Sequence, residues 1–217
     1  MAERVCFIVG GGELDPSLRL APEAGDLLIA ADAGLAAVDA MGLVPDLVIG
    51  DFDSLGEAPR GDNVVVLPRV KDDTDTAAAV KAGLSRGYRR FALYGGTGGR
   101  LAHTLANLQL LHGLSARACR GFLIGGGTVC TAVTDGELRF PAGLAGYLSV
   151  FCSGAPARGV TLSGLKYPLD RADLTAAYPL GVSNEFTGES ARVSVERGTL
   201  LVLWQGADAD PTLLRTL

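Results

Sequence analysis

The stretch LVIGDFDS, residues 47–54, combines two features from which the fold can be predicted. Its first four residues are apolar or glycine, which is typical of a short strand buried on both faces of a sheet. Its last four include Asp51 and Asp53, whose side chains point to the same side if the chain stays extended. The stretch therefore indicates a buried strand that ends in a pair of acidic residues.

Similar apolar runs recur on both sides of this stretch and alternate with helical patterns. We expect strands at residues 5–9, 27–31, 47–49, 64–67, 91–94 and 119–124. Segments that are rich in alanine and leucine and free of proline predict helices at residues 34–41, 76–84 and 101–111. Because strands and helices alternate, the first half is expected to form an α/β fold with a parallel sheet covered on both faces.

The pattern changes after about Gly127 to short, alternating runs separated by turn residues. Strands are expected at residues 129–133, 137–140, 147–151, 192–195 and 200–204. Val193 and Val195 face one way while Arg192 and Ser194 face the other, and residues 196–199 can form a turn. We therefore predict a hairpin with one buried face, within an all-β second half.

Composition limits the possible classes of function. The chain has 217 residues, 48% of them hydrophobic, enough to fill the core of one large or two small domains. Its net charge is −5, and no cluster of lysine and arginine interleaves with aromatic residues, so no nucleic-acid partner is expected. The apolar run near the N-terminus is too short for a signal peptide or membrane span, which predicts a cytoplasmic protein. The cysteines lack zinc-site spacing and are expected to be buried free thiols: Cys6, Cys119, Cys130 and Cys152.

A second group of acidic residues follows the next predicted strand. The segment KDDTDT, residues 71–76, leads into an alanine-rich helix and adds Asp72, Asp73 and Asp75 to the pair after residue 50. Five carboxylates on adjacent strand ends repel one another unless a cation neutralises them, and oxygen ligands suit Mg²⁺. The alternative is that these residues cap the helix, with Asp73 or Thr74 as the N-cap.

A glycine-rich segment, GGTGGR at residues 95–100, lies between a predicted strand and a predicted helix. In such a loop, backbone N–H groups can approach a phosphate, and Arg100 adds further donors. The segment matches neither of the common phosphate-loop patterns, and glycine also serves tight turns. The same two interpretations apply to glycines 10–12 and to Asp32. His103 and Asn107 share one helix face, where a packed or solvated histidine is the alternative to a catalytic one.

Segments across nearly the whole chain resemble the thiamine pyrophosphokinase family. They are ADAG (31–34), PDLVIGDFDSL (45–55), KDDTDTA (71–77), GGTGGRLAHTLANLQLL (95–111), GLKYPL (164–169) and VSNEFTGESARVSVERGTLLVLW (182–204). The resemblance implies a three-layer, Rossmann-like catalytic α/β domain at residues 1–126 and a thiamine-binding β-sandwich domain at residues 127–217. It also implies a homodimer with active sites shared between subunits.

The resemblance further implies transfer of pyrophosphate from ATP to the hydroxyl of thiamine, giving thiamine diphosphate and AMP. Its expected magnesium and catalytic residues are Asp51, Asp53 and Asp75. Its expected nucleotide-binding residues are Asp32, Gly96, Thr97, Gly98, Gly99, Arg100 and His103. Its expected thiamine-binding residues are Tyr167, Ser183 and Asn184.

One position departs from the family pattern. Ala102 stands where the family usually has an aspartate after Gly-Gly-Arg-x. We expect Asp53 or Asp75 to accept the proton of the attacking hydroxyl, and the sequence does not choose between them. Two other functions are compatible with parts of the pattern: a pyrophosphokinase for another heterocyclic alcohol such as a pterin, and a non-catalytic thiamine- or nucleotide-binding regulator.

Overall fold

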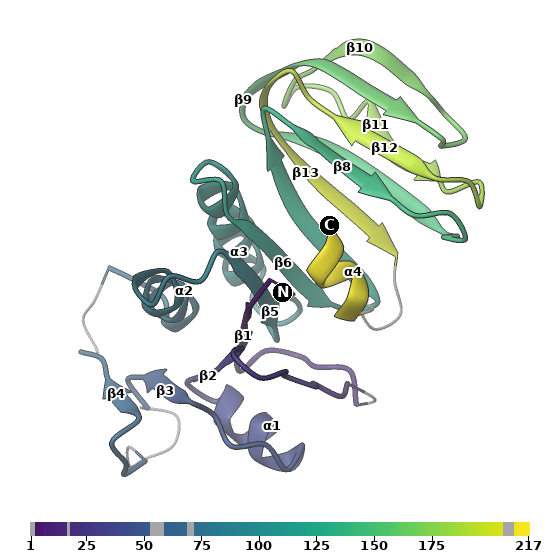
Figure 1. The fold of residues 1–217 in the computed structure, drawn as a ribbon. Helices are drawn as coiled ribbons and strands as arrows, with labels where there is room; N and C mark the ends of the chain where they lie inside the picture. The colour runs from purple at the N-terminus through teal and green to yellow at the C-terminus, as the bar shows by residue number, and fades with distance from the viewer. Residues whose placement is uncertain (1–2, 17, 53–58, 69–71, 206–210) are drawn as a thin grey trace. The chain divides into compact units, whose positions relative to one another are not determined.

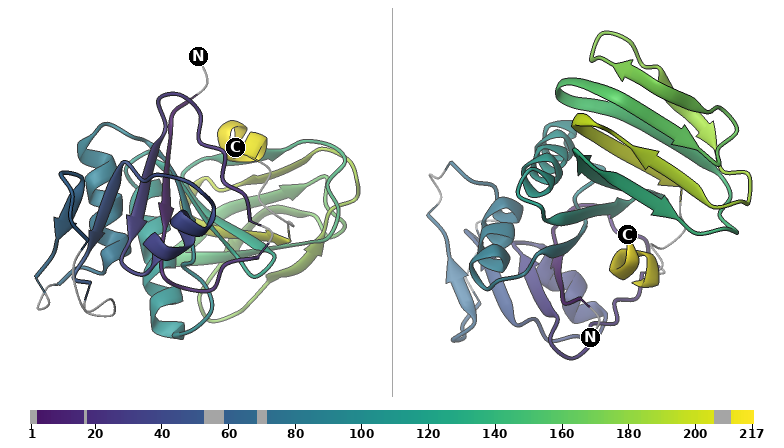
Figure 2. Two further views of the ribbon diagram at one scale, coloured as in Figure 1. Left: turned by 90° about the horizontal axis from the view of Figure 1, so that it is seen from below. Right: turned by 45° about the horizontal axis from the view of Figure 1, so that its top comes forward.

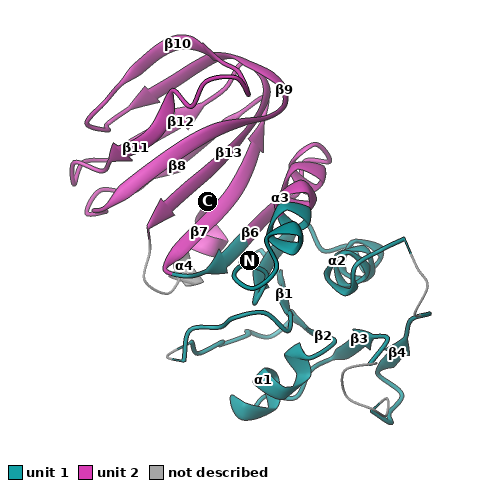
Figure 3. Ribbon diagram, turned by 180° about the vertical axis from the view of Figure 1, so that it is seen from behind, with its two compact units in different colours: residues 1–107, 123–126 teal, residues 108–122, 127–217 magenta. Residues whose placement is uncertain are grey.

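The structure, a computed structural model, describes residues 3–16, 18–52, 59–68, 72–205 and 211–217 (Figure 1). The chain divides into two compact units (Figure 3). The first comprises Met1–Asn107 and Leu123–Gly126, and the second comprises Leu108–Phe122 and Gly127–Leu217. Helix α3 (Leu101–Ser115) and strand β6 (Arg120–Gly125) therefore contribute residues to both units.

The first unit is built on a parallel sheet. Its strands run in the order β4-β3-β2-β1-β5, and each neighbouring pair is parallel. Their arrowheads lie at the same end in the left view of Figure 2. The strands are β1 (Val5–Val9), β2 (Leu27–Ala31), β3 (Leu47–Gly50), β4 (Val64–Val66) and β5 (Arg90–Tyr94). The prediction of a mixed α/β fold with parallel strands is confirmed.

Helices cover both faces of this sheet, which explains the continuous apolar runs of its strands. Helix α1 (Gly34–Ala40) lies on one face and α2 (Asp75–Ser85) on the other (Figure 1). Every residue of β1, β2, β3 and β5 is buried. A Cβ atom at Gly34 would lie 2.0 Å from the Val9 carbonyl oxygen, so only glycine allows α1 to start this close to β1.

The second unit is antiparallel. Its strands are β7 (Thr128–Thr134), β8 (Glu137–Phe140), β9 (Tyr147–Ser163), β10 (Leu169–Leu174), β11 (Gly181–Glu185), β12 (Ala191–Ser194) and β13 (Arg197–Gln205), with a short C-terminal helix, α4 (Pro211–Thr216). Phe140 is buried in its core, and its ring centroid lies 5.3 Å from the ring centroids of both Phe186 and Trp204. Edge-to-face contacts of this kind stabilise aromatic cores beyond the area that they bury.

The predicted hairpin of residues 192–195 and 200–204 is wrong. Strand β12 pairs with β8 and β9, whereas β13 pairs with β7 and β9. The chain changes partners between them, where the Val195 N–H donates to the Gly136 carbonyl at 2.9 Å and the Glu196 N–H donates to the Arg158 carbonyl at 3.1 Å. Each strand buries its apolar side chains on one face, as the alternation predicted. The prediction that the two strands pair with each other was wrong.

Strand β9 is also longer than predicted, because it continues past residue 151 to Ser163. Its early part pairs with β11 and β13, and residues 157–163 pair mainly with β10 and β12. Gly154, with φ of +77°, precedes Pro156 at the change of partners. These two residues resemble a loop in the sequence, although the structure uses them inside one continuous strand.

The expectation of free thiols is confirmed for all four cysteines, and the expectation of burial is confirmed for Cys6, Cys119 and Cys130. Cys152 is only half-buried. Burial raises the pKa of the Cys6 and Cys130 thiols to about 12, which keeps both protonated near neutral pH. As for membranes, no helix in the described ranges is both long and apolar enough to span a bilayer.

Candidate active site

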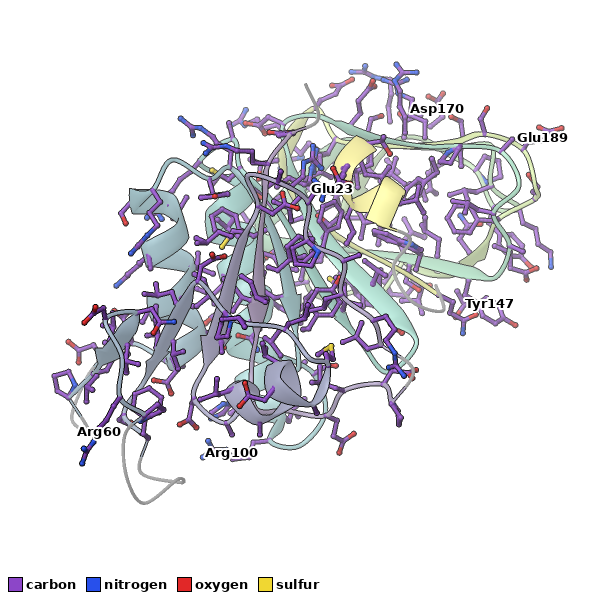
Figure 4. All side chains as sticks on the ribbon, turned by 60° about the horizontal axis from the view of Figure 1, so that its bottom comes forward. Glu23, Arg60, Arg100, Tyr147, Asp170 and Glu189 are labelled. Carbon is purple, nitrogen blue, oxygen red and sulfur yellow. The ribbon has the colours of Figure 1, made fainter. Side chains whose placement is uncertain are left out.

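The first unit contains a pocket of about 440 Å³ at the carboxyl ends of its parallel strands. Its walls come from the loops after β1, β2 and β5, from the start of α2 and from α3. Figure 4 shows Arg100 at this edge of the sheet and Glu23 at the opposite edge. Ligands of open parallel sheets collect at this edge. The lining residues are Gly10, Gly11, Gly12, Ala31, Asp32, Ala33, Thr74, Asp75, Thr76, Gly95, Gly96, Thr97, Gly98, Gly99, Arg100, His103 and Asn107.

Two glycine loops form one side of the pocket and bond to each other. The Gly10 N–H donates to the Tyr94 carbonyl at 2.8 Å, and the Gly12 N–H donates to the Gly95 carbonyl at 3.0 Å. A Cβ at Gly12 would lie 2.3 Å from the Gly95 oxygen, and one at Gly95 would lie 2.4 Å from the Gly10 oxygen. The close backbone approach thus requires glycine here, in agreement with the steric interpretation of these loops.

The rest of the glycine-rich segment presents donors without protein partners. Gly98 and Gly99 have φ of +77° and +57°, and a Cβ at Gly99 would meet no atom within 4 Å. In the portion of the chain that the structure describes, neither the N–H groups of Thr97, Gly98 and Gly99 nor the Arg100 guanidinium has a protein acceptor. Such a group of donors at a helix N-terminus suits an anion, and phosphate above all.

Asn107, on α3, forms a hydrogen bond to this segment, a role that sequence analysis missed. Its side chain is buried, and its Nδ2 donates to the Gly96 carbonyl at 2.8 Å. A Cβ at Gly96 would lie 2.6 Å from Leu123 Cδ1 and 2.8 Å from Asn107 Nδ2. Sequence analysis placed Asn107 on the helix face of His103. That position beside a glycine-rich loop was the available signal, since buried polar side chains need a partner.

The acidic residues of the segment at 71–76 have different surroundings at the start of α2. Thr74 is the N-cap, as the capping alternative predicted, and its Oγ1 accepts from the Ala77 N–H at 3.1 Å. Asp75 occupies the first turn and lines the pocket. Asp73 instead accepts from Lys81 Nζ with both carboxylate oxygens, at 2.8 and 2.5 Å, and does not line the pocket.

Asp32 and Asp51 stand at neighbouring strand ends. Asp32 has φ of +49°, and its N–H donates to the Ile49 carbonyl at 2.8 Å. A Cβ at Gly50 would lie 3.0 Å from Asp32 Cα, so the glycine before Asp51 lets the two strand ends approach. Asp32 lines the pocket, and Asp51 directly follows β3.

The carboxylates around the pocket fit a hard cation in donor type, because Mg²⁺ prefers carboxylate oxygens. Among the described residues, no three His, Cys, Asp or Glu side chains form a group that could hold a metal ion. Asp53, one of the three predicted ligands, lies outside the described residues. The predicted set of Asp51, Asp53 and Asp75 therefore stays a prediction.

The structure brings Tyr167, Ser183 and Asn184 together within the second unit. Asn184 is buried, its Nδ2 donates to the Tyr167 carbonyl at 2.6 Å, and its Oδ1 accepts from the Tyr167 N–H at 2.9 Å. Oδ1 also accepts from the Glu185 N–H at 2.9 Å. The Asn184 amide thus holds the backbone of Tyr167, a residue that is 55% exposed. Ser183 has φ of +59° and is exposed.

Comparisons with known proteins agree with this architecture. Two family models match the chain: the catalytic domain of thiamin pyrophosphokinase at residues 19–123 and its vitamin B1 binding domain at residues 137–200. A curated relative, thiamine pyrophosphokinase of Bacillus subtilis (strain 168), is 29% identical over 205 residues, which cover 90% of this chain and 96% of the relative.

Solved structures give the same result. Thiamine pyrophosphokinase from Bacillus subtilis has a TM-score of 0.80 at 25% identity, with 94% of this chain and 100% of that chain covered. Thiamin pyrophosphokinase from Geobacillus thermodenitrificans has a TM-score of 0.80 at 28% identity, with 94% and 99% covered. These matches define the class of protein as a kinase, a transferase of phosphate groups. The chain belongs to the thiamin pyrophosphokinase family.

Proposed function

We infer that this chain transfers pyrophosphate from ATP to the primary hydroxyl of thiamine, giving thiamine diphosphate and AMP. One observation in the structure carries this inference. The donors of Thr97, Gly98, Gly99 and Arg100 surround the same pocket as the Asp75 carboxylate. A site with anion donors on one side and carboxylates on the other suits a nucleotide phosphate that arrives with a cation.

The reaction needs positioning and charge neutralisation more than covalent help from the protein. The thiamine hydroxyl oxygen attacks the β-phosphorus, the bond from that phosphorus to the bridging oxygen of the α-phosphate breaks, and AMP leaves with the electron pair. The hydroxyl proton passes to Asp53 or Asp75. The backbone donors at residues 97–99, together with Arg100, stabilise the negative charge that builds up on the transferred group.

We propose that Asp51, Asp53 and Asp75 hold Mg²⁺ and that Asp32 and His103 contact the nucleotide. Asp75 and Asp32 line the pocket, and Asp51 follows the adjoining strand, which supports this set. When bound, the ion neutralises phosphate charge and reduces the repulsion between the carboxylates. Without it, the acidic strand ends would oppose the binding of ATP.

We further propose that residues 1–126 form the catalytic, Rossmann-like domain and that residues 127–217 form a β-sandwich that binds thiamine. The exposed ring of Tyr167 offers a face for the cationic thiazolium or the pyrimidine of thiamine. Asn184 acts by holding the Tyr167 backbone, since its amide is already bonded there. Ser183, which is exposed beside it, remains available for a polar contact with the substrate.

A cytoplasmic homodimer with shared active sites completes the proposal. Large apolar side chains are exposed on β9, on β11 and in the segment before β11, among them Tyr147, Tyr178, Leu180 and Val182. Figure 4 shows Tyr147 at the surface of the second unit. Exposed apolar side chains in this number favour a protein partner, and a second copy of the chain fits the proposed function.

The deciding experiment is incubation of the protein with thiamine, ATP and Mg²⁺, followed by separation of nucleotides and thiamine phosphates. We expect AMP and thiamine diphosphate in equal amounts. Stoichiometric ADP with thiamine monophosphate would refute the assignment of attack to the β-phosphorus. A parallel incubation with a hydroxymethylpterin in place of thiamine tests the other substrate class, and activity with the pterin alone would overturn the choice of thiamine.

A further inference from the structure

The peptide bonds of the glycine-rich segment are oriented by two hydrogen bonds on its protein side. The Gly95 carbonyl accepts from the Gly12 N–H, and the Gly96 carbonyl accepts from Asn107 Nδ2. The described peptide bonds are all trans. In a planar trans peptide, the carbonyl and the following N–H point in opposite directions. The N–H of Gly96 therefore points away from Gly12, and the N–H of Thr97 points away from the Asn107 amide.

The side chain of Thr97 lies against Gly125. A Cβ at Gly125 would lie 2.1 Å from Thr97 Oγ1, so the absence of a side chain at Gly125 leaves room for the Thr97 hydroxyl. Gly95 directly follows β5, and Gly125 is the last residue of the neighbouring strand β6. With its side chain seated there and the preceding carbonyl bonded to Asn107, Thr97 has little freedom to rotate its N–H.

Asn107 belongs to the pocket and is not merely a core residue. It is one of the few buried polar side chains among the described residues, at 5% exposure, and it lines the pocket together with Thr97. The Asn107 side chain donates to the Gly96 carbonyl, whereas the Thr97 N–H has no acceptor in the described part of the protein. A donor that is fixed in direction before the ligand arrives costs no reorganisation when an anion binds.

We propose that Asn107 is a positioning residue that aims the Thr97 N–H at the phosphate chain of the nucleotide. The proposal rests on the proposed function, since it assigns the anion in this pocket to ATP. It predicts that loss of the Asn107 donor weakens ATP binding on the order of tenfold to a hundredfold, the usual effect of one hydrogen bond to a charged group. Thiamine binding should be unaffected.

The test uses Asn107→Leu, which keeps a similar side-chain shape but removes the donor. Its matched control is Gln109→Leu, the same kind of change on an exposed position of the same helix. ATP and thiamine affinities of both variants and of the wild type are measured by calorimetric titration. In parallel, the Thr97 amide proton of the wild type is followed by NMR during titration with ATP and with inorganic tripolyphosphate. The expected result is a large downfield shift.

The outcomes separate the two proposals. Weaker ATP binding by Asn107→Leu alone, with a shifted Thr97 amide in the wild type, supports the inference. An Asn107→Leu variant that binds ATP within twofold of the wild type, or a Thr97 amide that does not move at saturation, overturns it while leaving the proposed function intact. A wild type that binds no nucleotide refutes both. If Asn107→Leu does not fold, the wild-type Thr97 measurement decides alone.

Discussion

At the scale of single residues, the two aspartates of the segment at 71–76 that flank Thr74 have different environments. Asp75 lines the pocket, whereas Asp73 pairs with Lys81 at the surface. In the sequence they are two positions apart and look alike. The N-cap at Thr74 separates them, because residues before and inside the first turn of a helix point in different directions.

We predict that Asp75→Asn and Asp51→Asn each reduce turnover by orders of magnitude while the fold survives. The amide keeps the shape of the side chain but removes the charge that would hold a magnesium ion. The control is Asp73→Asn, which loses only an exposed ion pair worth about 0–1 kcal/mol and should keep near-normal turnover. Steady-state rates and circular dichroism check this. Near-normal rates in both the Asp75 and the Asp51 variant would show that the metal site lies elsewhere.

Ala102 provides a second test at this scale. It is exposed in the first turn of α3, next to Arg100 and the glycine-rich segment. We expect Ala102→Asp to tighten magnesium binding or raise turnover, because it restores a carboxylate that the family pattern has there. The helix N-terminus favours the new charge by about 0.3–1 kcal/mol.

The measurement for Ala102→Asp is a magnesium titration of activity at saturating thiamine and ATP. Gln109→Asp, an exposed position further along α3, controls for the effect of added negative charge alone. A lower turnover together with weaker metal dependence would show that the site is complete without this carboxylate and that a further charge only adds repulsion.

At the scale of elements, glycines that look alike in the sequence have opposite effects on stability. Gly12 is required because a Cβ there would lie 2.3 Å from the Gly95 oxygen, which is backbone and cannot move aside. Gly113 lies inside α3, where a Cβ would meet nothing within 4 Å. Helical glycine without a steric role only weakens its helix.

We therefore predict opposite effects on stability for two alanine substitutions. Gly12→Ala should lower the free energy of unfolding by about 1–3 kcal/mol, the usual cost of overpacking, and should weaken ATP binding as the glycine loops separate. Gly113→Ala should raise it by about 0.5–1 kcal/mol through helix propensity. Urea unfolding of the two variants beside the wild type measures both. Equal stability of the two variants would contradict this account of the loops.

At the scale of the whole molecule, the proposed homodimer makes a prediction about mixtures. Chains with Asp75→Asn lack a pocket carboxylate, and chains with Tyr167→Ala lack the exposed ring of the second unit. If each active site takes residues from two subunits, a mixed dimer contains one site with both residues intact. Mixing the two inactive variants should restore part of the activity.

The control for this complementation is the double variant mixed with itself, which should stay inactive. Sedimentation of the wild type gives the state of assembly at the concentration of the assay. A fully active wild type that sediments as a monomer would exclude shared sites. Shared sites would also be excluded if the mixture of the two single variants is never more active than the variants measured separately.

The sequence by itself determined the family and the strands and helices of the first unit, but it did not predict β10, β11 or α4. Continuous apolar runs predicted the strands of the first unit, because a strand buried on both faces has no polar side. The order of the motifs identified the family, and the change of pattern near Gly127 marked an all-β second half, whose strands the structure pairs antiparallel. Each of these conclusions depends on neighbours in sequence, which is why periodicity and short motifs were enough.

Only the tertiary structure decided which residues meet. It replaced the predicted hairpin by separate pairings of β12 and β13 with β9, extended β9 through Gly154 and Pro156, and gave Asn107 its carbonyl partner. It also assigned Asp73 to Lys81 and the Asn184 amide to the Tyr167 backbone. Strand pairing and hydrogen bonds between distant residues depend on which buried surfaces fit together in space, and spacing along the chain carries no record of that fit.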